Sequence, residues 1–202
     1  MSLKIIGLTG SIGMGKSTVG KMFEQEGIPI YNVDAEIHKL YEVGGAAVEP
    51  LRAEFPEAIV DNRVDRPTLS KLVLGNDAAI KRLERVVHPL VGQHRAGFLS
   101  DAADASNSMV VLDVPLIFET GGEANFDKIV VVSAPADIQK SRVLARDDMT
   151  EEKFLSILER QTPDAIKREK ADFVINTNCS EEDTRDQVIS LIATLKEEFA
   201  HA

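Results

Sequence analysis

Gly10-Ser11-Ile12-Gly13-Met14-Gly15-Lys16-Ser17 is the stretch that decides the fold of this chain. It satisfies the pattern G-x-x-x-x-G-K-[ST], in which glycines let backbone N–H groups curl around an anion. In such a loop Lys16 reaches the outer phosphates and the Ser17 hydroxyl can bind Mg²⁺. The stretch therefore predicts a binding loop for a nucleoside triphosphate, and we call residues 10–17 the phosphate loop.

The flanking residues support this interpretation. The apolar run Lys4–Thr9 is typical of a buried parallel strand, and Val19, Met22 and Phe23 recur at helical spacing until Gly27. A strand, a loop and a helix in this order point the helix N-terminus at the bound phosphates. The alternative, a purely structural glycine-rich turn, leaves this order unexplained.

Composition limits the classes of function. The chain has 202 residues, enough for one domain, and its 23 basic and 33 acidic residues give a net charge of −10. This charge disfavours duplex nucleic acid as the main partner, whereas a small phosphorylated substrate remains compatible with it. Cys179 is the single cysteine, so neither an intrachain disulfide nor a cysteine zinc site can form. Without a signal segment or a long apolar run, we expect a cytoplasmic protein that binds no membrane.

Five apolar segments alternate with helical patterns, which predicts an α/β fold with a five-stranded parallel sheet. The segments are Lys4–Thr9, Ile28–Val33, Met109–Leu112, Lys128–Ser133 and Asp172–Thr177. The stretch from 34 to 108 is too long for one crossover helix and contains an amphipathic face that we expect to end at His88-Pro89. It is either the binding region for a second substrate or an elaboration of the scaffold. Residues 181–202 are expected to form an amphipathic helix.

Two arginines mark the region between the fourth and fifth segments. Arg142 and Arg146 are spaced i, i+4, which predicts that they share one helix face and can clamp phosphate oxygens. A solvated helix neutralised by the neighbouring acidic residues is an equally good interpretation of this pattern alone.

Carboxylates follow two of the predicted strands. Asp113 ends an apolar run, as expected of a residue that acts on Mg²⁺ or its bound water, and Asp34 follows the second segment. One carboxylate can handle the metal while the other orients or deprotonates a hydroxyl, although Asp34 can also serve as the N-cap of a helix that begins near Ala35. His38 is expected to face the cleft, and His88 is more simply a structural hydrogen-bonding residue.

Together these residues resemble the dephospho-coenzyme A kinase family over almost the whole chain. The resemblance is carried by Gly7-Leu8-Thr9-Gly10, Val33-Asp34-Ala35, Arg66-x-x-Leu69, Leu83-Glu84 with His88-Pro89, Asp113-Val114-Pro115-Leu116-Ile117-Phe118-Glu119, the Arg142/Arg146 pair and Ala171-Asp172-Phe173-Val174-Ile175. The stretch 113–119 is the most diagnostic, because other kinases with a phosphate loop do not usually carry it. The sequence departs from the family pattern at two positions: Glu36 stands where many members have Asp, and Thr177 stands where many members have Asn.

The resemblance implies a single three-layer kinase domain with a phosphate loop, similar to nucleoside monophosphate kinases. Its core would comprise about 1–34, 108–135 and 171–202, with a helical substrate-binding insertion at about 35–107 and a helical lid at about 136–170. It also implies transfer of the γ-phosphoryl group of ATP to the ribose 3′-hydroxyl of dephospho-CoA, with Mg²⁺, by a monomer or weak homo-oligomer.

The residue roles implied by the resemblance fall into four groups. Catalysis would involve Lys16, Asp34, Asp113 and Arg142, and Mg²⁺ would be held by Ser17 and, through water, Asp113. ATP would contact Ser11, Ile12, Gly13, Met14, Gly15, Lys16, Ser17, Thr18 and Arg146. Dephospho-CoA would contact Asp34, His38, His88, Pro115, Phe118 and Glu119. The sequence leaves open whether Asp34 or Asp113 is the general base.

Two other functions remain to be weighed. A kinase on the same core could act on a nucleoside monophosphate instead. A nucleotide switch or an ABC-type ATPase is disfavoured, because the chain lacks both an Asn-Lys-x-Asp segment and a Ser-Gly-Gly-Gln segment.

Overall fold

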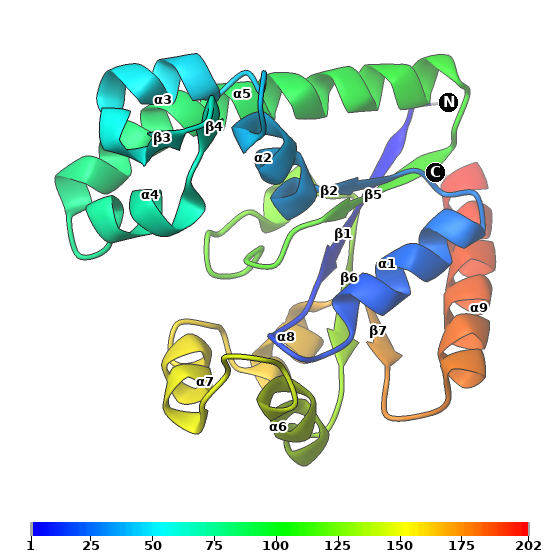
Figure 1. The fold of residues 1–202 in the computed structure, drawn as a ribbon. Helices are drawn as coiled ribbons and strands as arrows, with labels where there is room; N and C mark the ends of the chain where they lie inside the picture. The colour runs from blue at the N-terminus through cyan, green and yellow to red at the C-terminus, as the bar shows by residue number, and fades with distance from the viewer. Residues whose placement is uncertain (1, 202) are drawn as a thin grey trace. The chain divides into compact units, whose positions relative to one another are not determined.

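Strands and helices alternate along the chain as the apolar segments predict (Figure 1). The computed structural model describes residues 2–201. Its strands are β1 (Lys4–Thr9), β2 (Ile30–Asn32), β3 (Ile59–Val60), β4 (Arg63–Val64), β5 (Met109–Asp113), β6 (Lys128–Ser133) and β7 (Phe173–Asn176). Its α-helices are α1 (Lys16–Gln25), α2 (Val33–Tyr41), α3 (Val48–Glu54), α4 (Arg66–Val73), α5 (Asp77–Asp104), α6 (Ala136–Leu144), α7 (Glu151–Leu158), α8 (Asp164–Lys170) and α9 (Glu181–Ala200). Two 3₁₀ turns, η1 (Pro56–Ala58) and η2 (Glu123–Asn125), complete the elements.

The main sheet has five strands in the order β2-β5-β1-β6-β7. Strand β1 pairs in parallel with β5 and β6, and β6 pairs in parallel with β7. The register places Leu8 opposite Asp113, so β5 ends beside the start of the phosphate loop. The predicted five-stranded parallel sheet is confirmed.

Helices cover both faces of this sheet. Along β6, Val130 and Val132 pack into a core with residues of α1 and α9, whereas Ile129 and Val131 pack on the opposite face with Ile117 and Phe118. Helices α1 and α9 also contact each other, and α8 contacts β6 (Figure 1). Because strand side chains alternate between faces, the continuous apolar run of β6 supplies both interfaces.

The strand boundaries differ slightly from the predicted segments. Segments Lys4–Thr9 and Lys128–Ser133 are strands over their full predicted length, and β5 extends by one residue to Asp113. Within the second segment, only Ile30–Asn32 forms a strand, β2. Pro29 has no N–H to donate to a neighbouring strand, and Val33 already belongs to α2. The fifth narrows to β7, since Thr177 turns toward the phosphate loop.

The chain forms two compact units: Met1–Tyr31 with Ala102–Ala202, and Asn32–Asp101. The second unit has its own apolar core, which includes Leu51, Phe55 and Leu69. It also contains an antiparallel hairpin of β3 and β4, which the apolar segments of the sequence do not predict. Asp61 and Asn62 connect its strands with positive φ angles of 49° and 58°, as in a type I′ turn.

The expected helix end at His88-Pro89 is wrong. Helix α5 runs through Pro89 to Asp104. A proline inside a helix costs about 3 kcal/mol, because it removes one backbone hydrogen bond and crowds the preceding turn. Here the apolar face continues beyond the proline, and Leu90 and Val91 pack on the same core as Val87. No helix within residues 2–201 is long and apolar enough to cross a membrane.

Candidate active site

The phosphate loop connects β1 to α1 in a tightly folded conformation. Gly13 and Gly15 have φ angles of 80° and 90°, in the left-handed region that favours glycine. A Cβ atom added to Gly13 would lie 2.4 Å from Cγ2 of Val143, so the loop also leaves no space for a side chain there. The Met14 N–H donates to the Ser11 carbonyl at 3.2 Å and closes a turn within the loop. The predicted strand, loop and helix are all present.

Lys16 and Asp113 form an ion pair at the carboxyl ends of β1 and β5. The Lys16 Nζ contacts Oδ1 of Asp113, whose residue is only 2% exposed. The pairing of β1 with β5 brings the carboxylate to this position, and the start of α1 brings the ammonium. A buried carboxylate requires a nearby cation, which Lys16 supplies. The structure thus joins two of the predicted catalytic residues.

A cavity of about 270 Å³ adjoins the phosphate loop. Its lining comprises Gly13, Gly15, Thr18, Met22, Arg142, Arg146, Thr177, Cys179, Glu181 and Thr184. Two guanidinium groups therefore line one cavity beside the backbone that is predicted to bind phosphates. Their positive charge offsets the negative net charge of the molecule locally.

The predicted shared helix face for Arg142 and Arg146 is wrong. Helix α6 ends at Leu144, and the Arg146 N–H donates to the Val143 carbonyl at 3.1 Å in a tighter turn. Asp148 then takes a positive φ of 57°, which a continuing helix could not accommodate. The two arginines reach the same cavity from a helix and from the turn that follows it.

Thr177 connects the arginine to the phosphate loop. Arg142 donates from Nη1 to the Thr177 hydroxyl at 2.9 Å and from Nη2 to the Thr177 carbonyl at 2.7 Å. The same hydroxyl donates to the carbonyl of Met14 at 2.8 Å. Local sequence patterns predict no role for Thr177. Its position directly after β7, at the ligand-binding end of a parallel sheet, was the available signal.

The loop that follows Asp113 makes contacts within the first unit. The Thr9 hydroxyl donates to the carbonyl of Pro115 at 3.1 Å, and Phe118 is buried in the core on the α8 side of the sheet. Oε1 of Glu119 accepts the Thr162 N–H at 2.7 Å and lies 2.8 Å from Nζ of Lys167. The predicted substrate residues Phe118 and Glu119 thus have structural partners here.

Glu119 and Lys167 form a second buried ion pair. The side chain of Lys167 is 0% exposed and that of Glu119 is 12% exposed. Burial raises the pKa of Glu119, but the ion pair with Lys167 and the hydrogen bond from the Thr162 N–H outweigh it, and the pKa lies below its ordinary value. Glu119 is therefore ionised at neutral pH.

The remaining predicted residues lie in the second unit. Asp34 and His38 belong to α2, and His88 lies inside α5. Asn32 is the N-cap of α2, because its side chain accepts the Ala35 N–H at 2.8 Å. The proposed capping role for Asp34 is thus wrong, and Asp34 lies in the first turn of the helix. The Nε2 of His38 lies 3.4 Å from Glu42 Oε1 in an exposed pair.

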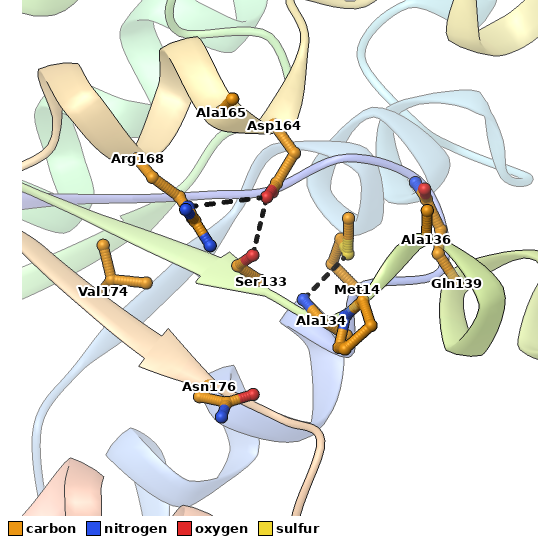
Figure 2. A pocket seen from close by; sticks show the side chains of 11 residues that line it. Met14, Ser133, Ala134, Ala136, Gln139, Asp164, Ala165, Arg168, Val174 and Asn176 are labelled. Carbon is orange, nitrogen blue, oxygen red and sulfur yellow. Dashed lines mark hydrogen bonds and ion pairs between the residues drawn. The ribbon is translucent and has the colours of Figure 1, made fainter.

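A second cavity, of about 450 Å³, borders the phosphate loop at Met14. Figure 2 shows Asp164 of α8 between Ser133 and Arg168, and Met14 beside Ala134. The Ser133 hydroxyl donates to Oδ2 of Asp164 at 2.8 Å, and the Ala134 N–H donates to the Met14 sulfur at 3.1 Å. These contacts connect the end of β6 with α8 and with the phosphate loop.

Known proteins are similar to this chain over most of its length. The family model described as Dephospho-CoA kinase matches residues 4–183. A dephospho-CoA kinase of Bradyrhizobium diazoefficiens is 49% identical over 191 residues, which cover 95% of this chain and 95% of the relative.

Solved structures are also similar. A crystal structure of a Thermus thermophilus protein has a TM-score of 0.81 and 34% identity, covering 96% of this chain and 99% of that one. The dephospho-CoA kinase from Campylobacter jejuni has a TM-score of 0.66 and 24% identity, covering 96% and 98%. This last similarity supports the fold alone.

Proposed function

This chain belongs to the dephospho-CoA kinase family, and on that premise we propose how its residues divide the work of phosphoryl transfer. The reaction moves the γ-phosphoryl group of ATP to the ribose 3′-hydroxyl of dephospho-CoA and gives CoA and ADP. The residue assignment rests on the Lys16–Asp113 ion pair. This pair lies beside a loop whose glycines have positive φ angles, and that loop adjoins a cavity lined by two arginines.

The phosphates of ATP bind along the backbone of the phosphate loop. Within residues 11–15, Gly13 and Gly15 supply N–H groups, because the N–H groups of Ile12 and Met14 are bonded to Gln161 and to the Ser11 carbonyl. Lys16 contacts the β- and γ-phosphates, and Thr18 contacts the α-phosphate. The cavity lined by Arg142, Arg146 and Thr177 receives the remainder of the nucleotide. The Lys16 ammonium group lies beside the buried Asp113 carboxylate. From there it stabilises the negative charge that develops on the transferred phosphoryl group.

Mg²⁺ fits the oxygen donors at this end of the sheet. The Ser17 hydroxyl lies at the start of α1, and the Asp113 carboxylate ends β5 beside Lys16. Hard cations of this kind prefer hydroxyl, carboxylate and water oxygens. We assign Ser17 as a direct ligand and Asp113 as a partner of the bound water. When bound, Mg²⁺ neutralises charge on the phosphate oxygens.

Arg142 stabilises the transferred phosphoryl group, with Arg146 in a supporting role. Nη1 and Nη2 of Arg142 both donate to Thr177, so the side chain exchanges these bonds for bonds to phosphate oxygens during the reaction. We propose that residues 136–170 act as the lid and that its mobile part is the stretch between Gln139 and Gln161, both of which are bonded to Ile12. Arg146 lies within that stretch.

The unit Asn32–Asp101 binds the acceptor, dephospho-CoA. Asp34 orients or deprotonates the attacking 3′-hydroxyl, and His38 and His88 contribute to acceptor binding. The loop that contains Pro115, Phe118 and Glu119 acts on the acceptor through its shape. Phe118 packs in the core and Glu119 pairs with Lys167, so these two side chains are already engaged within the first unit. Whether the base is Asp34 or Asp113 is tested by Asp34→Asn, which should lower kcat by roughly 10²–10⁴-fold with ATP binding retained.

The function is tested by measuring ADP release and CoA formation from Mg-ATP and dephospho-CoA. Reactions with AMP, with UMP and without an acceptor serve as controls. Equal amounts of CoA and ADP with dephospho-CoA alone would support the proposal. Turnover with a nucleoside monophosphate and none with dephospho-CoA would contradict it. The cytoplasmic location and the monomeric or weakly oligomeric state stay predictions, and light scattering after size exclusion tests the second.

A further inference from the structure

Two partly buried glutamine contacts hold a single residue of the phosphate loop. Gln161 Oε1 accepts the N–H of Ile12 at 3.1 Å, and Gln139 Nε2 donates to the carbonyl of Ile12 at 2.8 Å. Gln139 comes from α6 and is 5% exposed, whereas Gln161 lies between α7 and α8. Gln139 also lines the cavity of Figure 2 together with Met14. The phosphoryl-transfer roles assigned above use neither side-chain amide.

The contact to the Ile12 carbonyl fixes the direction of the next N–H. A trans peptide is planar, so its C=O and its N–H point in opposite directions. When Gln139 holds the Ile12 carbonyl, the N–H of Gly13 must point to the other side of that peptide. This matters most at Gly13, because its φ of 80° lies in a region where glycine has considerable backbone freedom.

Thr177 makes the corresponding contact two peptides further on. Its hydroxyl donates to the Met14 carbonyl, so the N–H of Gly15 points away from Thr177. Side chains from two distant segments therefore hold two alternate carbonyls of the loop. Both glycine N–H groups that follow these carbonyls belong to the predicted phosphate-binding set.

Gln161 is itself held through the residue that follows it. The Thr162 N–H donates to Oε1 of Glu119 at 2.7 Å, and Glu119 pairs with the buried Lys167. The backbone at Gln161 is therefore tied to the loop that begins at Asp113. This gives the Gln161 amide a defined position from which to accept the N–H of Ile12.

We propose that Gln139 and Gln161 are positioning residues that aim the Gly13 N–H at the phosphates of ATP by holding the two ends of Ile12. This inference rests on the proposed ATP site in the phosphate loop. The two amides have opposite polarity: Gln139 must donate, because its partner is a carbonyl, and Gln161 must accept, because its partner is an N–H.

This opposite polarity provides a matched test. Gln161→Glu keeps an oxygen that accepts the Ile12 N–H, whereas Gln139→Glu loses the donor and faces the Ile12 carbonyl with a carboxylate. Both variants add the same charge beside the same residue, so their difference isolates the hydrogen bond. We expect Gln139→Glu to bind ADP roughly tenfold more weakly than Gln161→Glu in calorimetric titrations. Equal ADP affinities would overturn the proposal.

The neutral variants Gln139→Met and Gln161→Met keep the side-chain length and remove the polar contacts. Each should raise the KM for ATP several-fold and leave the KM for dephospho-CoA within about twofold, since one hydrogen bond to the loop is worth about 1 kcal/mol. Equal increases in both KM values would overturn the proposal and indicate a general packing role. The wild-type chain serves as the reference: if it forms no CoA, the proposed function fails, while the ADP titrations still test the glutamine assignment.

Discussion

Two lysine–carboxylate pairs lie at the two ends of one stretch, Asp113–Glu119, and they differ in access. Lys16 pairs with Asp113 at the start of the stretch, and Lys167 pairs with Glu119 at its end. The side chain of Lys16 is 16% exposed and projects from the phosphate loop, whereas that of Lys167 is 0% exposed. The carboxylates show the reverse, with side chains 1% exposed at Asp113 and 12% at Glu119, so the accessible member is the lysine in the first pair and the carboxylate in the second.

This difference teaches that burial and charge alone do not identify a catalytic pair. Both carboxylates face an ammonium group, and both pairs connect distant parts of the sequence. Only the Lys16–Asp113 pair adjoins the glycines with positive φ angles and the N-terminus of α1, where we propose that the phosphates of ATP bind. The Lys167–Glu119 pair instead ties α8 to the loop after β5 and supports the Thr162 N–H. We expect the first pair to govern activity and the second to govern stability.

The largest effect should come from Asp113→Asn. This change removes the charge opposite Lys16 and the proposed partner of the Mg²⁺ water, so kcat should fall by roughly 10²–10³-fold. Steady-state assays of CoA formation would measure it, with Glu119→Gln as the matched carboxylate-to-amide control. If Glu119→Gln lowered kcat as much as Asp113→Asn, the division between the two pairs would be wrong.

Lys167→Met should have the largest effect on stability. It leaves the Glu119 carboxylate without its cation in a largely buried position, which costs about 3–5 kcal/mol of unfolding free energy. Urea titrations followed by circular dichroism would measure the loss.

The double variant Glu119→Leu with Lys167→Met provides the control for this prediction. Removing both charges leaves no unpaired ion, so much of the lost stability should return. A double variant as unstable as Lys167→Met alone would show that packing, rather than the unpaired charge, causes the loss.

The stability of the chain should depend on pH through Glu119. Its pKa in the folded state lies below the ordinary value of 4.5, so ionised Glu119 stabilises the fold above that pH. This contribution should be lost as the pH falls from about 4.5 through the lower folded pKa. Urea titrations at several pH values would show wild-type stability converging with that of Glu119→Gln below this range. A constant difference between them at all pH values would contradict the assignment.

Thr177→Val should have the smallest effect. It removes the hydroxyl that bonds both Arg142 and the Met14 carbonyl, and keeps the Thr177 carbonyl as the second partner of Arg142. We expect a loss of about 1 kcal/mol in ADP binding, measured by calorimetry. The variant Thr194→Val, which removes an exposed hydroxyl bonded to the Ser190 carbonyl within α9, serves as a control for hydroxyl removal outside the cavity.

Local patterns predicted the sheet and the phosphate loop well. The run Lys4–Thr9 forms β1 over its full predicted length because a buried parallel strand needs continuous apolar residues, and the run before Asp113 forms β5 for the same reason. Local rules failed where tertiary packing outweighed them. Helix α5 continues through Pro89 because the apolar face on both sides of the proline packs on one core.

The contacts that shape the site could not be predicted from local patterns. Gln139 and Gln161 lie 127 and 149 positions from Ile12, and a glutamine in a helical region carries no signal of a distant backbone partner. Glu119 was predicted to bind substrate, but nothing near it in the sequence indicates its pairing with Lys167. These contacts require knowledge of how α6, α8 and the loop after β5 pack together.

The most direct test of the division between the two pairs is CoA formation by Lys16→Met and Lys167→Met, measured in parallel at a temperature where both variants are folded. We predict that Lys16→Met lowers kcat by at least roughly 10²-fold, because its charge acts mainly in the transition state, while Lys167→Met stays within a few-fold of wild type. Near-normal turnover by Lys16→Met, or an equal loss in both variants, would contradict the account.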